Sequence, residues 1–192
     1  MGHQIIDRVS GRTGMLVLLL MVLMGKTWGQ QYFTKTGHVS FFSQAPMEKI
    51  EAYNQSAYVI MDAASGKVEL SVLIKGFQFA KALMQDHFNE NYMESHIYPK
   101  GIFKGSILNM KEVNLGKDGD YTANVSGNIT MHGITRPLTT TGHIVVKGGK
   151  VTVNSKFVLT VADFNISIPK VVRDNIAKTV DVTVTAELQV LK

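Results

Sequence analysis

Five histidines outside the first 29 residues are the side chains best suited to hold a metal ion: His38, His87, His96, His132 and His143. Metal sites on a helix place two histidines four residues apart beside a glutamate, and those on a strand place them two residues apart, with one residue between them. No pair in this sequence has either spacing. We therefore expect no metal site. We interpret His132, which opens a predicted turn, as a structural residue whose imidazole hydrogen-bonds neighbouring backbone.

The side chains needed for covalent or acid–base catalysis are equally sparse. The chain has no cysteine, so it offers neither a thiol nucleophile nor a disulfide. It has no Gly-x-Ser-x-Gly motif and no glycine-rich phosphate loop. Asp86 and Glu90 are one helical turn apart, which for exposed carboxylates is typical of a solvated face. We expect neither an enzyme nor a cofactor, and an enzyme acting on a lipidic substrate is the less favoured alternative.

The elements that carry these residues are mostly β-strands, and the clearest covers residues 121–131. Apolar side chains alternate there with polar ones, which predicts a strand with one buried face. Gly133 and Pro137 then interrupt the pattern before a second β-rich segment. Residues 132–137 are therefore predicted to connect two long antiparallel strands, with His132, Gly133 and Pro137 as its structural residues.

Similar patterns predict about eight strands, mostly joined by hairpins, at residues 38–43, 56–62, 67–75, 102–113, 121–131, 144–147, 151–159 and 178–191. Residues 79–92 change to helical spacing, since Ala80, Met84, Phe88 and Tyr92 recur every four residues. The last strand would span roughly 46 Å and must twist or coil. Closing these strands into an antiparallel barrel removes exposed edges.

Residues 1–29 have the pattern of a secretory signal peptide. Arg8 and Arg12 precede an apolar run at residues 15–24, and small residues follow up to Gly29. The run is about half as long as a membrane span, so we expect cleavage near Gly29, with a membrane anchor as the alternative. The domain at residues 30–192 would then be periplasmic or secreted, without stable membrane insertion. Losing three basic residues and one acidic residue lowers the net charge from +5 to +3, too little to suggest nucleic-acid binding.

Four segments resemble the YceI family, the periplasmic polyisoprenoid-binding proteins of bacteria. They are residues 37–41 (Gly-His-Val-Ser-Phe), residues 86–88 (Asp-His-Phe) with 92–95 and 98–105, residues 125–137 (Val-Ser-Gly-Asn-Ile-Thr-Met-His-Gly-Ile-Thr-Arg-Pro), and Phe157 with residues 163–166 and the closing strand. Position 165 is asparagine, where the family carries glycine. The resemblance spans essentially all of residues 30–192.

The resemblance implies an all-β fold, an elongated eight-stranded antiparallel lipocalin-like barrel with one amphipathic helix at its mouth. It implies an apolar tunnel for an isoprenoid or similar long-chain lipid, and it carries over no catalytic residue. We accordingly expect an exported protein that carries or sequesters such a lipid. Its role could be related to envelope stress. The pattern alone also fits a closed-core barrel that acts through its surface, because small barrels are often packed solid. An exposed sheet surface could also pair two copies of the chain into a homodimer.

The inward faces of the predicted strands and helix supply the candidate tunnel lining. Smooth aliphatic walls suit a hydrocarbon chain, which needs contact but little polar recognition. The candidate ligand-binding residues are Phe41, Leu70, Val72, Met84, Phe88, Phe103, Val125, Ile129, Val153, Phe157, Val182 and Val184.

Overall fold

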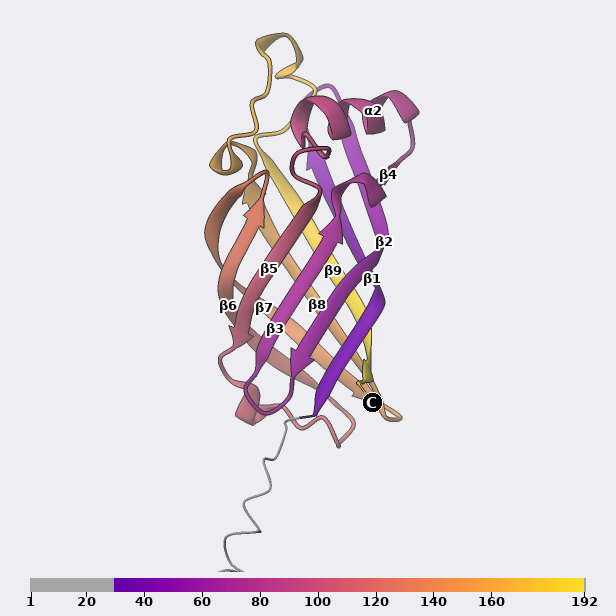
Figure 1. Ribbon diagram of the computed structural model, residues 1–192, viewed down its shortest axis with the longest axis vertical. Helices are drawn as coiled ribbons and strands as arrows, with labels where there is room; N and C mark the ends of the chain where they lie inside the picture. The colour runs from indigo at the N-terminus through magenta and orange to yellow at the C-terminus, as the bar shows by residue number, and fades with distance from the viewer. Residues whose placement is uncertain (1–29, 192) are drawn as a thin grey trace, which may run out of the picture.

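A computed structural model describes residues 30–191 as an elongated barrel with a short helix at one end (Figure 1). The predicted signal peptide at residues 1–29 lies outside the described residues. Eight strands form a closed antiparallel ring in the order β1-β9-β8-β7-β6-β5-β3-β2, with the pair β1–β2 closing it. A ninth strand, β4 (Gln78–Phe79), pairs only with β2. The predicted all-β, eight-stranded antiparallel barrel is confirmed.

The ring strands are β1 (Gln31–Gln44), β2 (Lys49–Asp62), β3 (Lys67–Leu73), β5 (Lys100–Ile107), β6 (Gly119–Met131), β7 (Ile134–Lys147), β8 (Lys150–Thr160) and β9 (Thr179–Val190). The helical segments are η1 (Ile74–Gly76), α2 (Ala82–His87), η2 (Phe88–Tyr92), η3 (Met110–Glu112), η4 (Val161–Phe164) and η5 (Lys170–Val172). None of those within residues 30–191 is long and apolar enough to cross a membrane.

Strand β5 is shorter than predicted, because the strand expected over residues 102–113 ends at Ile107. At Asn109 the side chain, rather than the backbone, makes the hydrogen bonds to β6. Its amide donates to the Thr122 carbonyl over 2.9 Å and accepts from the Asn124 backbone N–H over 2.8 Å. A local side-chain bond of this kind competes with regular pairing and ends the strand.

The connection between β6 and β7 is also shorter than predicted. Only His132 and Gly133 lie between the strands, and both have positive φ angles, 50° and 72°, as a two-residue hairpin of type I′ requires. Pro137 lies inside β7, opposite Asn128, so its predicted place in the connection is wrong. Proline is accommodated because β7 pairs with β8 only from Gly142 onward, which leaves Pro137 a strand partner on one side.

Strands β7 and β8 are not paired between Ile134 and Thr141 of β7, on the mouth side of the Gly142–Ser155 pair. We call this region the β7–β8 seam. The Thr140 hydroxyl donates to the Lys156 carbonyl over 3.1 Å, a side-chain bond where a ladder bond would be expected. Segment η4 covers the widening gap, since Arg136 Nε donates to the Asp163 carbonyl over 2.9 Å. The seam is therefore held by side chains rather than by continuous backbone pairing.

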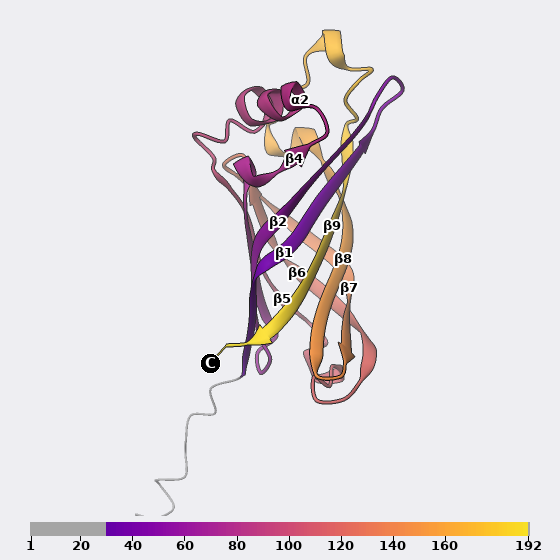
Figure 2. The same cartoon turned by 90° about the vertical axis from the view of Figure 1, so that its right-hand side faces the viewer.

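The helix predicted over residues 79–92 is divided in the structure. Its first residue belongs to β4, α2 covers Ala82–His87, and a π-helical turn, η2, covers Phe88–Tyr92. Single π turns are rare and are found mostly at functional sites. The helix lies over one end of the barrel in both views (Figures 1 and 2). We call this end the mouth and the opposite end the base.

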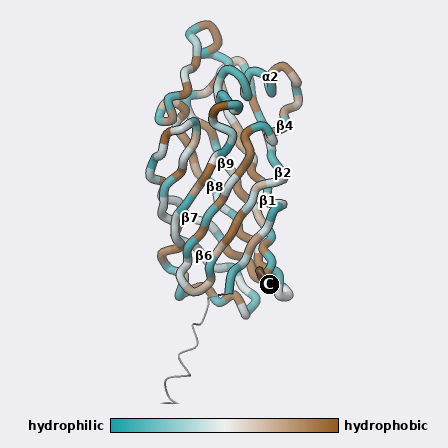
Figure 3. Tube along the Cα trace, viewed as in Figure 1, coloured by the Kyte–Doolittle hydropathy of each residue, from teal (hydrophilic) through white to brown (hydrophobic). Residues whose placement is uncertain are grey.

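Hydropathy alternates along the ring strands (Figure 3). Because successive side chains of a strand point to opposite faces, one in two points into the barrel. The buried side chains form two clusters. The mouth cluster comprises Val39, Ala52, Ala57, Val72, Ile74, Phe77, Met93, Leu159, Phe164, Ile166, Val182 and Val184. The base cluster comprises Tyr32, Val59, Met61, Ile107, Met110, Ala123, Ile144, Val146, Val151, Ala186 and Leu188.

Candidate functional site

The interior of the barrel holds a cavity of about 490 Å³, within the size range of small-molecule sites. It runs from the mouth, where Met84 and Val172 border it, to the base cluster, where Met61 and Leu188 border it. Every ring strand contributes to the wall, because alternate side chains of each strand face inward. The site is therefore a product of the whole barrel rather than of one loop or one motif.

The structure places every candidate lining residue named from the sequence on the wall of this cavity: Phe41, Leu70, Val72, Met84, Phe88, Phe103, Val125, Ile129, Val153, Phe157, Val182 and Val184. Their contact with a ligand stays a prediction. The wall also contains residues that the sequence reasoning did not select: Val39, Val59, Met61, Val68, Phe77, Phe79, Ile107, Ala123, Leu138, Ile144 and Leu188. The same period of two would have found most of them.

The middle of the barrel is hollow, because its inward-facing side chains border empty space. Leu70, Val125 and Val153 face inward, yet each keeps part of its surface accessible because empty space lies in front of it. Two wall positions carry no side chain at all, since Gly101 and Gly142 both border the cavity. Apolar side chains that face an unfilled volume leave dispersion contacts unmade, which an apolar ligand could supply.

Four phenylalanines form an aromatic cluster directly beneath the helix: Phe41, Phe77, Phe79 and Phe88. Phe88, the first residue of η2, contacts the other three, with ring centroids 5.5 Å from Phe41, 5.8 Å from Phe77 and 5.0 Å from Phe79. Phe88 thereby attaches the helix to the barrel. Phe77 and Phe79 are not among the residues selected from the sequence, although their alternation before the helix was a usable signal.

The rim of the mouth is polar and joins three segments. Lys81, just before α2, bonds Glu48 in the β1–β2 turn, with 2.9 Å between Nζ and Oε1. The hydrogen bond from Lys81 is the main cause that lowers the pKa of the Glu48 carboxyl, and Asn175 contributes a further hydrogen bond. The Met47 backbone N–H donates to the Asp174 carbonyl over 2.9 Å. The β1–β2 turn is thus tied both to the helix and to the segment that contains η5.

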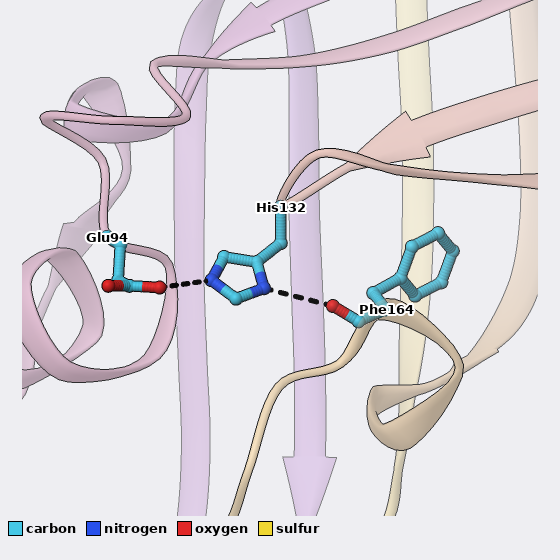
Figure 4. Close-up of polar contacts among 3 residues, drawn as sticks. All are labelled: Glu94, His132 and Phe164. Carbon is cyan, nitrogen blue, oxygen red and sulfur yellow. Dashed lines mark hydrogen bonds and ion pairs between the residues drawn. The ribbon is translucent and has the colours of Figure 1, made fainter.

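His132 holds two further segments together below the rim (Figure 4). Its Nε2 lies 2.8 Å from Glu94 Oε2 and its Nδ1 lies 2.9 Å from the Phe164 carbonyl oxygen. Both ring nitrogens are thus within hydrogen-bond distance of an oxygen on another segment. The expectation that His132 would bond neighbouring backbone is wrong, because its partners are 38 and 32 residues away.

The β6–β7 turn that presents His132 is held in place by Tyr98. The Tyr98 ring stacks edge-on against the imidazole, with centroids 4.7 Å apart. A Cβ added at Gly133 would come within 2.7 Å of the same ring, so glycine is required there both for space and for its positive φ. Gly133 has the structural role that the sequence suggested, whereas Pro137 is remote from these contacts.

Titratable side chains are few on the cavity wall, and the described structure does not bring them together in one cluster. Glu48 bonds Lys81 at the rim, and His143 bonds Asp120, 2.9 Å away on the outer face. Burial raises the pKa of the Tyr92 phenol. Within residues 30–191 no group of three or more His, Asp or Glu side chains is placed to hold a metal ion. The wall is suited to contact with hydrocarbon rather than to proton transfer.

Comparisons with known proteins place this architecture. A family model described as the YceI-like domain matches residues 30–188. No curated protein sequence matches the chain. A solved polyisoprenoid binding domain from Saccharophagus degradans, implicated in plant cell wall breakdown, is similar with a TM-score of 0.74 and 13% identity over 84% of this chain and 98% of that one. Burkholderia cenocepacia BcnA is similar with a TM-score of 0.64 and 18% identity over 80% of this chain and 96% of that one.

Proposed function

This chain belongs to the YceI family of domains, and on that premise we propose that its barrel binds one long-chain apolar lipid of the isoprenoid type. The observation that carries the proposal is the apolar cavity of about 490 Å³ that runs from the mouth to the base cluster. The similar solved domain from Saccharophagus degradans, which binds polyisoprenoid by its name, supports the ligand class.

The energetics of such a site are those of area burial. Each methylene that leaves water contributes about 0.8 kcal/mol, so ten of them contribute about 8 kcal/mol before association costs. The gain grows with every further methylene that is buried, whereas the association cost is incurred once. A long hydrocarbon chain would therefore bind without any directed polar contact, which agrees with a wall that is mainly apolar and has few polar residues, such as Thr140 and Ser155.

The polar groups on the cavity wall indicate which end of a bound lipid would face the mouth. Ser43, Glu48 and Asn175 border the cavity at the rim, whereas the base cluster is almost entirely aliphatic and methionine. A polar headgroup buried in the base would lose its hydrogen bonds to water without replacement. We infer that the hydrocarbon tail points to the base and that the headgroup stays at the mouth.

The proposed setting is outside the cytoplasm, in the periplasm or the medium. The signal-like pattern of residues 1–29 supports this. In that setting the protein would carry or sequester a lipid that is insoluble in water.

Native mass spectrometry of the gently purified protein, followed by lipid extraction, is the deciding experiment. We expect a complex heavier than the protein by one lipid and a prenyl-type compound in the extract. A variant with Leu70→Trp, which fills the tunnel, should lose the added mass. The matched variant Glu69→Trp, at the adjacent outward position, should keep it. Absence of any passenger, together with no uptake of added prenyl lipids, would refute the proposal.

The same measurement separates this function from the alternatives. A closed-core barrel that acts through its surface would bind no lipid in any variant. An enzyme acting on a lipidic substrate would release a chemically altered lipid over time. The hollow interior favours the carrier over the closed core.

A further inference from the structure

The mouth carries three exposed apolar side chains on three separate segments. Met47 lies in the β1–β2 turn, Leu83 lies on α2 and Val171 lies in η5. They are 75%, 65% and 91% exposed, although apolar side chains of this size are usually covered in a soluble protein. Figures 1 and 2 show that the β1–β2 turn, α2 and the segment with η5 all lie at the helix end of the barrel.

These three side chains belong to one connected rim rather than to independent loops. The Met47 backbone bonds the Asp174 carbonyl, which ties the β1–β2 turn to the η5 segment. Lys81, two residues before Leu83, bonds Glu48, which ties the same turn to α2. Because the turn is linked to both neighbours, the three apolar tips are held around a single opening.

Basic side chains flank the apolar tips. Lys170 and Arg173 lie on either side of Val171, and Lys49 lies two residues after Met47; all three are exposed. Among the acids of these segments, Glu48 is paired with Lys81, and Asp174 and Asp86 are exposed. Exposed apolar tips with long basic side chains beside them are typical of surfaces that enter the headgroup region of an anionic bilayer.

The same segments also line the cavity. Ile168 and Val172 border the cavity from the η5 segment, while Val171 between them faces solvent. On α2, Met84 borders the cavity and its neighbour Leu83 faces solvent. The apolar tips therefore surround the opening through which a ligand enters, with one set of side chains facing in and the next facing out.

We propose that the rim formed by Met47, Leu83 and Val171 docks on the surface of an anionic lipid bilayer, with the cavity opening facing the membrane. The inference rests on the proposed function, since a bilayer is the store from which a water-insoluble lipid is taken or to which it is delivered. Docking in this orientation lets a lipid tail move between bilayer and cavity without crossing water.

Site-specific labelling tests the proposal directly, because the full chain contains no cysteine. Val171→Cys at the mouth and Leu108→Cys near the base, which is 68% exposed, are each labelled with an environment-sensitive dye. With vesicles of phosphatidylcholine containing about one third phosphatidylglycerol, the dye at position 171 should shift to the blue and be quenched by brominated lipid. The dye at position 108 should do neither. Equal responses at both positions, or no response at 171, would overturn the proposal.

Vesicle co-sedimentation of charge variants gives the second arm. The triple variant Met47→Asp, Leu83→Asp, Val171→Asp should bind these vesicles at least tenfold more weakly than the unaltered chain. Leu108→Asp with Leu191→Asp, which alters exposed apolar side chains at the base, should bind as the unaltered chain does. Equal binding by the mouth variant contradicts the inference. So does a mouth variant that loses only self-association, because the rim would then be a contact between two copies of this chain.

Failure of the docking inference and failure of the proposed function give different results. Binding of a short fluorescent prenyl probe, added without vesicles, reports on the cavity alone. If the probe binds the mouth variant normally while vesicle binding is lost, both proposals hold. If the probe does not bind the unaltered chain, the lipid-binding function fails, whatever the dye at position 171 reports.

Discussion

The mouth and the base of this barrel are built from the same strands but differ in how their interiors are filled. At the base, side chains such as Met61 and Val151, each 1% exposed, belong to one buried apolar cluster at the end of the cavity. At the mouth the buried mouth cluster lies beside the cavity, and loops, a π turn and an aromatic cluster cover that end. Alternation thus specifies which side chains face inward, whereas side-chain volume and the capping segments decide whether the inside is solid or hollow.

The largest expected effect comes from Phe88, which attaches the helix to the mouth. Phe88→Ala should remove three ring contacts and open the segment Ala82–His87 locally, with amide exchange there faster by about 100-fold. Hydrogen exchange measured by mass spectrometry checks this. Leu83→Ala, on the exposed side of the same helix, is the control and should leave the exchange rates unchanged. Identical exchange in both variants would mean that the aromatic cluster does not hold the helix.

His132 should come next, since it is buried and bonds two distant segments. His132→Ala should lower the free energy of unfolding by about 2 kcal/mol, because Glu94 and the Phe164 carbonyl each lose a partner. The matched variant His143→Ala removes a similar bond to Asp120 from the exposed outer face and should cost almost nothing. Chemical denaturation of both variants decides the point, and equal losses would contradict the assigned role of His132.

Two valines on one face of β8 test the contrast between solid base and hollow middle. Val151 is buried in the base cluster, whereas Val153 borders the cavity. Val151→Ala should lower the free energy of unfolding by about 1.5 kcal/mol, and Val153→Ala by about 0.5 kcal/mol, because the latter removes contacts that are already incomplete. Denaturation without ligand measures both. A larger loss at Val153 would indicate that the middle of the barrel is packed.

The smallest effect concerns a carboxylate at each end. Hydrogen bonds from Ser65 lower the pKa of Asp62 in the β2–β3 turn at the base, and the bond from Lys81 lowers that of Glu48 at the rim. A depressed folded-state pKa gives stability that is present above the unfolded value near 4 and is lost as the pH falls below it.

We expect Asp62→Asn to remove about 0.5 kcal/mol or less of this acid-sensitive stability, since the turn is exposed. The pH dependence of the denaturation midpoint between about pH 6 and pH 3 measures it. Added salt should weaken the contribution of Glu48 more than that of Asp62, because Glu48 depends on a charged partner. Equal salt sensitivity at both ends would contradict this difference.

The barrel could be predicted from the sequence because its information is local. A side chain's direction in a strand depends only on its place in the alternation, so residues such as Leu70, Val125 and Val153 were placed inward correctly. Even Asn165, where the family carries glycine, fits its left-handed position at φ 56°, which asparagine tolerates better than most residues.

What could not be predicted depends on partners remote in the sequence. Phe88, where the α-helix gives way to the π turn, packs on Phe41 of β1, a contact that no local pattern encodes. Pro137 lies in a strand because β7 has a side free of ladder partners, and that freedom follows from the course of β8. The partners of His132 were missed for the same reason. Whether the interior is open or packed depends on the summed volumes of the inward side chains and on the segments that cover the barrel ends. The alternation of apolar and polar residues contains no information on either.

The pairing of the first and last strands fixes how the molecule can be tethered. Tyr32 pairs with Val190, so residue 30 and the C-terminus both leave the barrel at the base, opposite the helix. If residues 1–29 were retained as a membrane anchor, the opening would face away from the membrane that holds the chain and could reach only a bilayer opposite it. If they are cleaved, the molecule turns freely and either bilayer is within reach. The same geometry makes either chain end the place to attach a tag or a surface linker, because neither obstructs the opening.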